Sequence, residues 1–309
     1  MRVAFRFEQL AGEPARRVVT VGNFDGVHRG HRAVLAAAAQ IASARELEAA
    51  ALTFEPHPVE RLRPGAARLR LLEPQRKLEL LAESGARTVL AQRFDERFAA
   101  LSPEEFARDV LAGALGARVV IVGDNFRFGR DRRGDLGALR LLGEKLGFET
   151  RGHEIVEEGG AGISSSRIRD LLARGEVAAA REMLGRCHEV PGTVARGRGD
   201  GRRLGCPTIN LDDVRVLPPG PGVYAALCDV DDRTHPAAAY SGRRPTLGHG
   251  PSLEAHLIGF EGDLYGRRVR LRFVERLRDE LRFAGPEELS RQLECDVELA
   301  RKLLESGDD

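Results

Sequence analysis

The chain has 309 residues, with 48 Lys+Arg against 47 Asp+Glu and a formal net charge of +1. This length indicates two domains, because single hydrophobic cores stop growing at about 250–300 residues. The balanced charge gives no electrostatic argument for a nucleic-acid or membrane partner, and no run reaches the roughly 18 apolar residues that span a bilayer. The N-terminus has no basic segment followed by an apolar one, so we expect a cytoplasmic protein.

Cysteine and lysine usage narrows the possibilities further. No CxxC pair occurs, so we expect neither a disulfide framework nor a structural metal. The four cysteines are widely spaced: Cys187, Cys206, Cys228 and Cys295. Almost all basic residues are arginines, and the lysines are only Lys77, Lys145 and Lys302. This bias is typical either of many bidentate phosphate contacts or of a GC-rich genome, and the second interpretation requires no site.

Strands and helices alternate over residues 1–185. The predicted strands are Arg17–Gly22, Ala49–Phe54, Arg87–Ala91 and Arg118–Gly123. The predicted helices are Gly30–Ala44, Pro74–Glu83, Pro103–Ala114 and Leu136–Leu146. Ser102 and Glu105 form a capping box at the start of the third helix. The alternation predicts a doubly wound, Rossmann-like α/β sheet, in which ligands bind beyond the carboxyl ends of the strands.

The pattern changes near residue 186. Apolar and polar residues alternate in Leu253–Leu257 and in Leu264–Phe273, as they do in antiparallel strands. A terminal helix follows Gly285-Pro286, because apolar residues then recur at helical spacing: Leu289, Leu293, Val297, Ala300 and Leu304. We therefore predict a small antiparallel β-barrel with a C-terminal helix, and domains of residues 1–185 and 186–309.

The loop after the first strand reads GNFDGVHRGH, residues 22–31. His28 and His31 share one face of the helix that starts there. Gly30 has no Cβ and allows a ligand to approach the backbone, and the helix N-terminus supplies free N–H donors. Together these features predict a cradle for a polyphosphate. A metal site is less favoured, because no third ligand lies nearby and zinc-binding helices use an i, i+4 spacing.

A second motif, ISSSRIR at residues 163–169, opens another predicted helix. Its serines are candidate N-caps, and N-capping alone would explain them. Arg167 lies in the first turn, where a cation opposes the helix dipole. A bound anion would remove that penalty, so this segment is a second candidate for phosphate binding.

These motifs carry a family resemblance. HxGH with a downstream ISSSxIR resembles the nucleotidylyltransferase superfamily. More narrowly, GNFDGVHRGH, TFEPHP (53–58), VGDNFRFG (122–129) and ISSSRIR resemble the adenylyltransferase half of prokaryotic bifunctional riboflavin kinase/FMN adenylyltransferases, also called FAD synthetases. The resemblance covers residues 17–185 and includes four motifs in the same order.

The resemblance implies an in-line attack of the FMN phosphate on the α-phosphorus of ATP, with pyrophosphate released. Positioning and charge neutralisation would supply the catalysis. His28, His31 and Arg167 would be catalytic. The implied ATP-binding residues are Gly22, Asn23, Phe24, Asp25, Gly30 and Ser164, and the implied flavin-binding residues are Pro56, Pro58, Asn125 and Phe128. From the residues alone, Phe54 and Phe128 fit core packing equally well, and His57 fits a plain loop position.

The second half contains a glycine-rich stretch, GTVARGRGDGRRLGCPTINL at residues 192–211. Amides freed by Gly197, Gly201 and Gly205 can wrap phosphates. Thr208 and Asn210 can offer oxygen atoms to Mg²⁺. The stretch lacks the GK[ST] of a P-loop, so a flexible hairpin loop is the alternative interpretation.

Further motifs follow in order: GVYAA (222–226), RRPT (243–246), LEAHL (253–257), DLYG (263–266) and LRDELRF (277–283). The series resembles the riboflavin kinase module, which implies a six-stranded barrel with a C-terminal helix. The resemblance makes Glu254 the general base for the riboflavin 5′-hydroxyl. It also implies flavin binding by Arg278, Glu280 and Phe283. By periodicity alone, Glu254 would equally fit an exposed strand position.

The sequence departs from the family pattern in three places. Cys206 replaces an aromatic residue before Pro-Thr, and Ile209 replaces a small residue. Tyr240-Ser241 replaces the usual Asn-Ile/Val before the Gly-x-x-Pro-Thr turn. Thr208, Asn210 and Glu254 are retained, so we expect the kinase to be active.

We therefore predict synthesis of FMN from riboflavin and then of FAD from FMN, each step using ATP with Mg²⁺. One alternative is an FMN adenylyltransferase whose barrel is a regulatory flavin-binding module. A flavin carrier without turnover is a weaker alternative, because it has no use for a general base. The expected partners are riboflavin, FMN, FAD and ATP, with neither nucleic acid nor membrane, and the expected state is a monomer or weak homo-oligomer.

Overall fold

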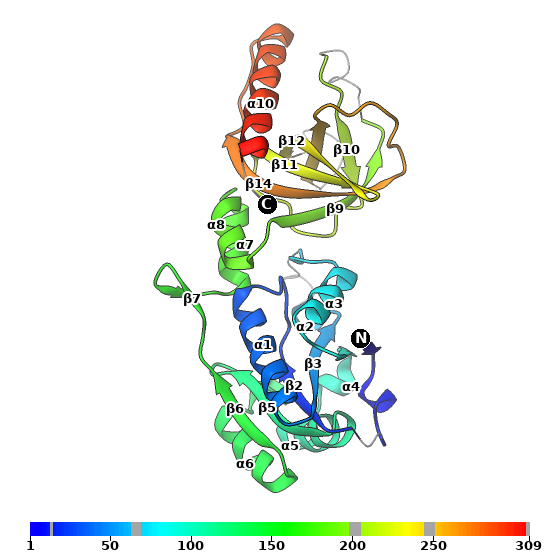
Figure 1. The fold of residues 1–309 in the computed structure, drawn as a ribbon, viewed down its shortest axis with the longest axis vertical. Helices are drawn as coiled ribbons and strands as arrows, with labels where there is room; N and C mark the ends of the chain where they lie inside the picture. The colour runs from blue at the N-terminus through cyan, green and yellow to red at the C-terminus, as the bar shows by residue number, and fades with distance from the viewer. Residues whose placement is uncertain (13–14, 63–68, 198–204, 244–250, 307–309) are drawn as a thin grey trace. The chain divides into compact units, whose positions relative to one another are not determined.

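The computed structural model describes residues 1–12, 15–62, 69–197, 205–243 and 251–306 (Figure 1). The chain divides into two compact units. The first unit comprises Met1–Arg68 and Glu73–Ser164, and the second comprises Leu69–Leu72 and Ser165–Asp309. The predicted domains met near residue 185, whereas these units meet at Ser164/Ser165.

The first unit is built on a six-stranded parallel sheet in the order β1-β4-β3-β2-β5-β6 (Figure 1). The strands are β1 (Arg2–Ala4), β2 (Arg17–Val21), β3 (Glu48–Glu55), β4 (Thr88–Arg93), β5 (Ala117–Gly123) and β6 (Glu149–His153). The central strand β2 is buried at every position, as expected for a strand covered on both faces. The predicted α/β class is confirmed.

Helices and short connecting elements complete this unit. They are η1 (Phe7–Gln9), α1 (Arg29–Ala44), α2 (Pro58–Leu62), α3 (Pro74–Glu83), α4 (Glu96–Ala99), α5 (Pro103–Glu105), the π-helix η3 (Phe106–Ala114), η4 (Arg130–Arg132) and α6 (Leu136–Leu146). A two-stranded ribbon of β7 (Glu157–Glu158) and β8 (Ala161–Gly162) follows β6. The main core lies between the sheet and η3, with α6 packed beside it.

All four strands and four helices predicted in this unit are present. The capping box is confirmed: the Glu105 amide donates to Ser102 Oγ at 3.1 Å, and the Ser102 amide donates to Glu105 Oε2 at 2.7 Å. The helix that it starts continues as a π-helix, which periodicity did not predict. The edge strands β1 and β6 were missed, because β1 is only three residues long and β6 is partly exposed throughout.

The second unit is a closed six-stranded antiparallel barrel in the order β10-β13-β12-β11-β14-β9. Its strands are β9 (His188–Ala195), β10 (Ile209–Asp212), β11 (Gly222–Val230), β12 (Arg233–Arg243), β13 (Pro251–Leu257) and β14 (Arg268–Arg278). The predicted strand at Leu253–Leu257 lies in β13. The prediction for Leu264–Phe273 starts too early, because a turn with Gly266 at φ +74° precedes β14.

Two helices pack on this barrel, and a third packs on one of them. α10 (Pro286–Ser306) packs against β11 and β12 (Figure 1), with Val297, Ala300 and Leu304 in a shared apolar cluster. α8 (Val177–Leu184) packs against β9 and β14, and α7 (Ser165–Ala173) packs against α8. The predicted C-terminal helix is confirmed. No helix within the described ranges combines the length and hydrophobicity needed to cross a bilayer.

A four-residue segment from early in the chain also belongs to the second unit. Arg70 forms a parallel β-bridge with Val216. The Leu217 amide donates to the Arg70 carbonyl at 2.8 Å. Leu69–Leu72 therefore pairs with residues far downstream, although the segments on both sides of it belong to the first unit.

Candidate active sites

The first candidate site is the loop between β2 and α1. His28 is the N-cap of α1, and its Nδ1 accepts the backbone N–H of His31 at 3.3 Å. The two imidazoles stack, with centroids 3.6 Å apart and 17° between planes. Because Nδ1 accepts, the ring proton of neutral His28 lies on Nε2. The predicted shared face is present, and His28 additionally caps the helix.

The backbone of this loop is held in an uncommon conformation. Phe24 and Val27 have φ of +49° and +38°, and both side chains are buried. Such strain clusters at functional sites. The Phe24 ring contacts His31 edge-on at 5.2 Å, and a Cβ on Gly22 would lie 3.2 Å from it. The buried Phe24 side chain thus packs against His31 and Gly22 of the same loop.

Gly30 has a role that its sequence position did not reveal. A Cβ at this position would lie 3.2 Å from Nδ1 of His28, so glycine leaves space for the capping imidazole. Asp25 is 6% exposed and His28 is 5% exposed. The loop therefore combines two stacked imidazoles with a helix N-terminus, an arrangement suited to an anion such as a polyphosphate.

The residues predicted to bind flavin lie near two other strand ends. The Glu55–Pro56 bond that follows β3 is cis, and Pro58 begins α2. After β5, Asn125 lies close to Gly123, where a Cβ would be 3.3 Å from its Oδ1. Phe128 is 5% exposed and belongs to the main core. Phe126, which is partly buried, stacks on Phe128 at 5.5 Å and 12°.

Lys77 is a residue beside this site that the motif search did not select. It lies on α3, is 8% exposed, and donates to the Phe54 carbonyl at 3.3 Å and to Glu55 Oε2 at 3.4 Å. It therefore holds the end of β3 just before Pro56. The signal was available, because lysine is rare in this arginine-rich chain.

Ser164 and Arg167 lie at the boundary between the units. Ser164 directly precedes α7 and is exposed, and Arg167 is half-buried in its first turn. Ser164 is the last residue of the first unit, whereas Arg167 belongs to the second. Their binding of the ATP phosphates stays a prediction.

The second candidate site is a row of side chains across the barrel. Asn210 of β10 lies directly opposite Glu254 of β13. Glu254 in turn lies opposite Tyr240 of β12. A Cβ on Gly197 would come within 2.2 Å of Asn210 Nδ2, so the backbone at Gly197 lies directly against that amide. The barrel thus brings together Gly197, Asn210 and Glu254, three of the residues predicted for the kinase.

A cavity of about 310 Å³ adjoins this row. Thr208, Glu254, Arg278, Glu280 and Phe283 all line it, although the segments that carry them are far apart in the sequence. Apolar residues of α10 close one side: Leu289, Leu293 and Val297. A mostly apolar cavity with a few convergent polar groups is typical of a small-molecule site.

Arg278 makes a contact that the motif did not predict. Its Nε and Nη2 donate to Asp296 of α10 at 2.9 and 2.7 Å, and its guanidinium lies 5.7 Å from the Phe283 ring. Asp296 is 3% exposed. Sequence reasoning missed Asp296, but a signal existed: it lies on the apolar stripe of α10, where a carboxylate needs a partner.

Two predicted phosphate-binding glycines have different outcomes. Gly201 lies outside the described residues. Gly205 has φ +75° in a turn just before β10, a conformation that glycine adopts readily.

Cys206, one of the departures from the family pattern, is buried and lines the cavity. Burial, followed by the charge of Asp296, raises the pKa of its thiol to about 11. The thiol is therefore uncharged at physiological pH.

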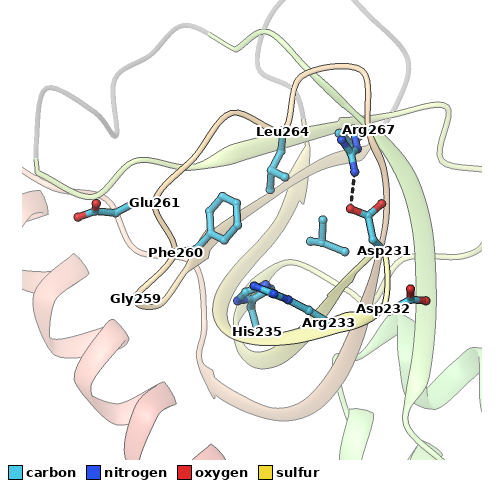
Figure 2. A pocket seen from close by; sticks show the side chains of 10 residues that line it. Asp231, Asp232, Arg233, His235, Gly259, Phe260, Glu261, Leu264 and Arg267 are labelled. Carbon is cyan, nitrogen blue, oxygen red and sulfur yellow. Dashed lines mark hydrogen bonds and ion pairs between the residues drawn. The ribbon is translucent and has the colours of Figure 1, made fainter.

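A larger cavity of about 550 Å³ lies at the turn between β11 and β12 (Figure 2). In Figure 2, Asp231 and Arg267 form an ion pair at its rim. His235 meets the Phe260 ring edge-on at 5.1 Å. None of the predicted site residues lines this 550 Å³ cavity, and we assign no ligand to it.

The donors at the barrel site fit a magnesium ion carried by a nucleotide. Thr208 and Asn210 supply neutral hard oxygen atoms, and Mg²⁺ is usually held by one or two protein oxygens together with substrate phosphates. Within the described ranges, no three His, Cys, Asp or Glu side chains gather to hold a metal ion. The described donors therefore suit a metal that shares its coordination with the substrate.

Comparison with known proteins gives a family match for each half of the chain. The FAD synthetase family model matches residues 11–167, and the riboflavin kinase family model matches residues 184–304. A crystal structure described as a macrolide-efflux protein from Streptococcus pneumoniae has a TM-score of 0.87 and 28% identity, and the match covers 97% of this chain and 98% of that chain.

Curated relatives match along nearly the whole length. A bifunctional riboflavin kinase/FMN adenylyltransferase from Escherichia coli K12 is 40% identical over 287 residues, 92% of each chain. The Pseudomonas fluorescens relative of the same description is 39% identical over 305 residues, 98% of each chain. The Bacillus subtilis relative is 33% identical, over 93% of this chain and 92% of that one. Two family models in the predicted order and relatives of this length leave one conclusion: the chain belongs to the bifunctional riboflavin kinase/FMN adenylyltransferase family.

Proposed function

We propose that the barrel site phosphorylates riboflavin to FMN and that the site on the parallel sheet then adenylylates FMN to FAD. The chain is a transferase with both activities of its family. The observation that carries the assignment of sites is the row in which Asn210 lies opposite Glu254 beside the 310 Å³ cavity. We assign the kinase to residues 186–309 and the adenylyltransferase to residues 1–185.

In the kinase, riboflavin occupies the cavity with its 5′-hydroxyl toward Glu254. The Glu254 carboxylate accepts the hydroxyl proton while the oxygen attacks the γ-phosphorus of ATP, and ADP leaves. Thr208 and Asn210 hold the metal that accompanies ATP, and Gly197, Gly201 and Gly205 surround its phosphates. When bound, Mg²⁺ supplies charge neutralisation at those phosphates. Arg278, Glu280 and Phe283 contact the flavin.

In the adenylyltransferase, a phosphate oxygen of FMN attacks the α-phosphorus of ATP, and pyrophosphate leaves. The side chains of His28 and His31 and the amides at the start of α1 stabilise charge on the phosphates. The loop of Gly22, Asn23, Phe24 and Asp25 positions ATP. Ser164 and Arg167 bind the β- and γ-phosphates, and Pro56, Pro58, Asn125 and Phe128 border the flavin.

The remaining features follow the same scheme. Magnesium with ATP is the metal that both reactions need, and the chain has no structural metal. The enzyme is cytoplasmic, acts as a monomer or weak homo-oligomer, and works on small molecules without a nucleic-acid or membrane partner. The balanced net charge of +1 supports the expectation of neither a nucleic-acid nor a membrane partner.

One experiment tests both activities. The purified protein is incubated with riboflavin and Mg·ATP, and FMN and FAD are quantified separately by chromatography. We expect FMN to appear first and FAD to follow. FMN replaces riboflavin in a parallel incubation. If FMN is converted to FAD there but riboflavin is not converted to FMN, the barrel is a flavin-binding module and the kinase assignment is wrong.

A further inference from the structure

Tyr240 belongs to the proposed kinase site, at a position where the family pattern has Asn. It continues the cross-strand row, lying opposite Glu254 on one side and opposite Val223 on the other. It also lines the 310 Å³ cavity. Directly opposed residues on antiparallel strands have Cβ atoms about 5 Å apart. The phenol ring therefore stands next to the proposed general base.

The Tyr240 hydroxyl reaches the segment between β14 and α10. It donates a hydrogen bond to Glu280 Oε1. The ring passes over Gly242, where a Cβ would lie 2.1 Å from the hydroxyl oxygen, so the backbone leaves room for this orientation. Glu280 itself is exposed. The hydrogen bond fixes a carboxylate that would otherwise sample many rotamers at the edge of the cavity.

Burial raises the pKa of Tyr240 above its ordinary value, and the hydrogen bond and negative charge of Glu280 and the charge of Glu254 raise it further. The phenol is therefore protonated throughout the physiological range. It can donate to Glu280 but cannot compete with Glu254 as a base. Glu280 retains a second oxygen that can accept a hydrogen bond from a ligand.

We propose that Tyr240 is a positioning residue for riboflavin, which holds the Glu280 carboxylate at the cavity so that its second oxygen accepts an N–H or O–H of the flavin. This inference rests on the proposed function, which places riboflavin in this cavity. The Asn that the family uses is too short to reach Glu280 in the same way. This way of holding Glu280 therefore depends on a residue that departs from the family pattern.

Tyr240→Phe tests the inference in the full-length enzyme. Removing one hydrogen bond to a charged, exposed group should raise the KM for riboflavin about tenfold. We expect kcat, the KM for Mg·ATP and the conversion of FMN to FAD to stay within about twofold of wild type. Thr234→Val is the matched control. Thr234 lies on β12 like Tyr240 but does not line the 310 Å³ cavity, and its hydroxyl donates to the Asp229 carboxylate of β11 at 2.8 Å.

Coupling to Glu280 separates positioning from a general loss of structure. Glu280→Ala should raise the KM for riboflavin at least as much as Tyr240→Phe, and the double variant should equal Glu280→Ala alone. Glu280→Gln keeps an acceptor oxygen and should restore part of the affinity. Additive effects, an equal rise in the KM for ATP, or an unchanged KM in Tyr240→Phe would each overturn the inference.

A binding measurement distinguishes failure of this inference from failure of the proposed site. Riboflavin fluorescence is titrated with each variant in the absence of ATP, and Leu293→Trp is added to fill the cavity from α10. If Leu293→Trp abolishes binding and Tyr240→Phe weakens it about tenfold, the inference is supported. If Leu293→Trp blocks binding but Tyr240→Phe has no effect, only the role of Tyr240 is wrong. If neither variant changes binding, riboflavin does not occupy this cavity and both proposals fall.

Discussion

The two sites are assembled in opposite ways. In the first unit, the capping imidazole, its stacking partner and the loop that precedes them all come from one short stretch between β2 and α1. In the barrel, Asn210, Glu254 and Tyr240 come from three strands and meet only because the strands pair in register. The first site is a local structure, whereas the second is a product of the whole barrel.

Because of this difference, we expect substitutions to affect the two sites differently. A change in the β2–α1 loop alters the helix cap and the proposed phosphate donors together, because the same His28 ring caps α1 and is one of those proposed donors. A change in the barrel can remove one function from the row and leave the strands paired. The barrel site should therefore allow its chemistry and its stability to be changed separately, and the following predictions test this contrast.

The largest effect is expected for Glu254→Gln. Loss of the proposed general base should reduce riboflavin kinase turnover by about two to four orders of magnitude, whereas conversion of supplied FMN to FAD stays near wild type. Separate assays with riboflavin and with FMN measure this. Kinase activity within about threefold of wild type would contradict the role of Glu254.

The next effect is expected at the first site. His31→Ala removes one proposed donor to developing phosphate charge and should cost about 3 kcal/mol, roughly a hundredfold in FAD formation. FMN should then accumulate from riboflavin. His153→Ala, at the end of β6, is a control within the same unit. Equal loss of both activities, with the fold intact by circular dichroism, would mean that the two sites are one.

Asp296→Asn tests stability in the barrel unit. The change leaves the Arg278 cation largely buried without its carboxylate, and breaking a buried pair costs about 3–5 kcal/mol. We expect the denaturant midpoint of kinase inactivation to fall while that of adenylyltransferase inactivation does not. Glu298→Gln is the control, because it breaks exposed pairs with Arg301 and Lys302 that are each worth less than about 1 kcal/mol. Equal effects of the two variants would show that burial does not strengthen the Arg278–Asp296 pair.

The smallest effect concerns acid stability of the parallel sheet. Burial raises the pKa of Glu48, but hydrogen bonds from Thr88 and Arg17 and the charge of Arg17 outweigh it and hold the pKa below its ordinary value. The ionised carboxylate therefore stabilises the first unit above about pH 4.3, and this contribution is lost as pH falls through the lowered pKa. The denaturant midpoints of wild type and Glu48→Gln should differ at pH 7 and converge at low pH. A difference that persists at low pH would exclude the charge as the cause.

The same contrast explains what could be predicted from the sequence. The HxGH stretch could be interpreted directly, because residues three apart at a helix start share one face in any context. Its additional capping bond could not, since it depends on the rotamer of His28. For the barrel, alternation predicted strands but not their register, so nothing in the sequence showed that Tyr240 would lie opposite Glu254. Asp296 required the position of α10, which only the packed structure provides.

The segment Leu69–Leu72 has a consequence for biosynthesis. The ribosome makes Arg70 long before Val216, its partner in the β-bridge. Closing a contact across so many residues carries a loop entropy that must be offset by structure formed elsewhere. During translation the first unit can assemble its sheet as its strands emerge, but this segment must wait until the barrel strands have been made. Completion of the second unit is therefore a late event that requires both an early and a late part of the chain, and no single cut separates the two compact units.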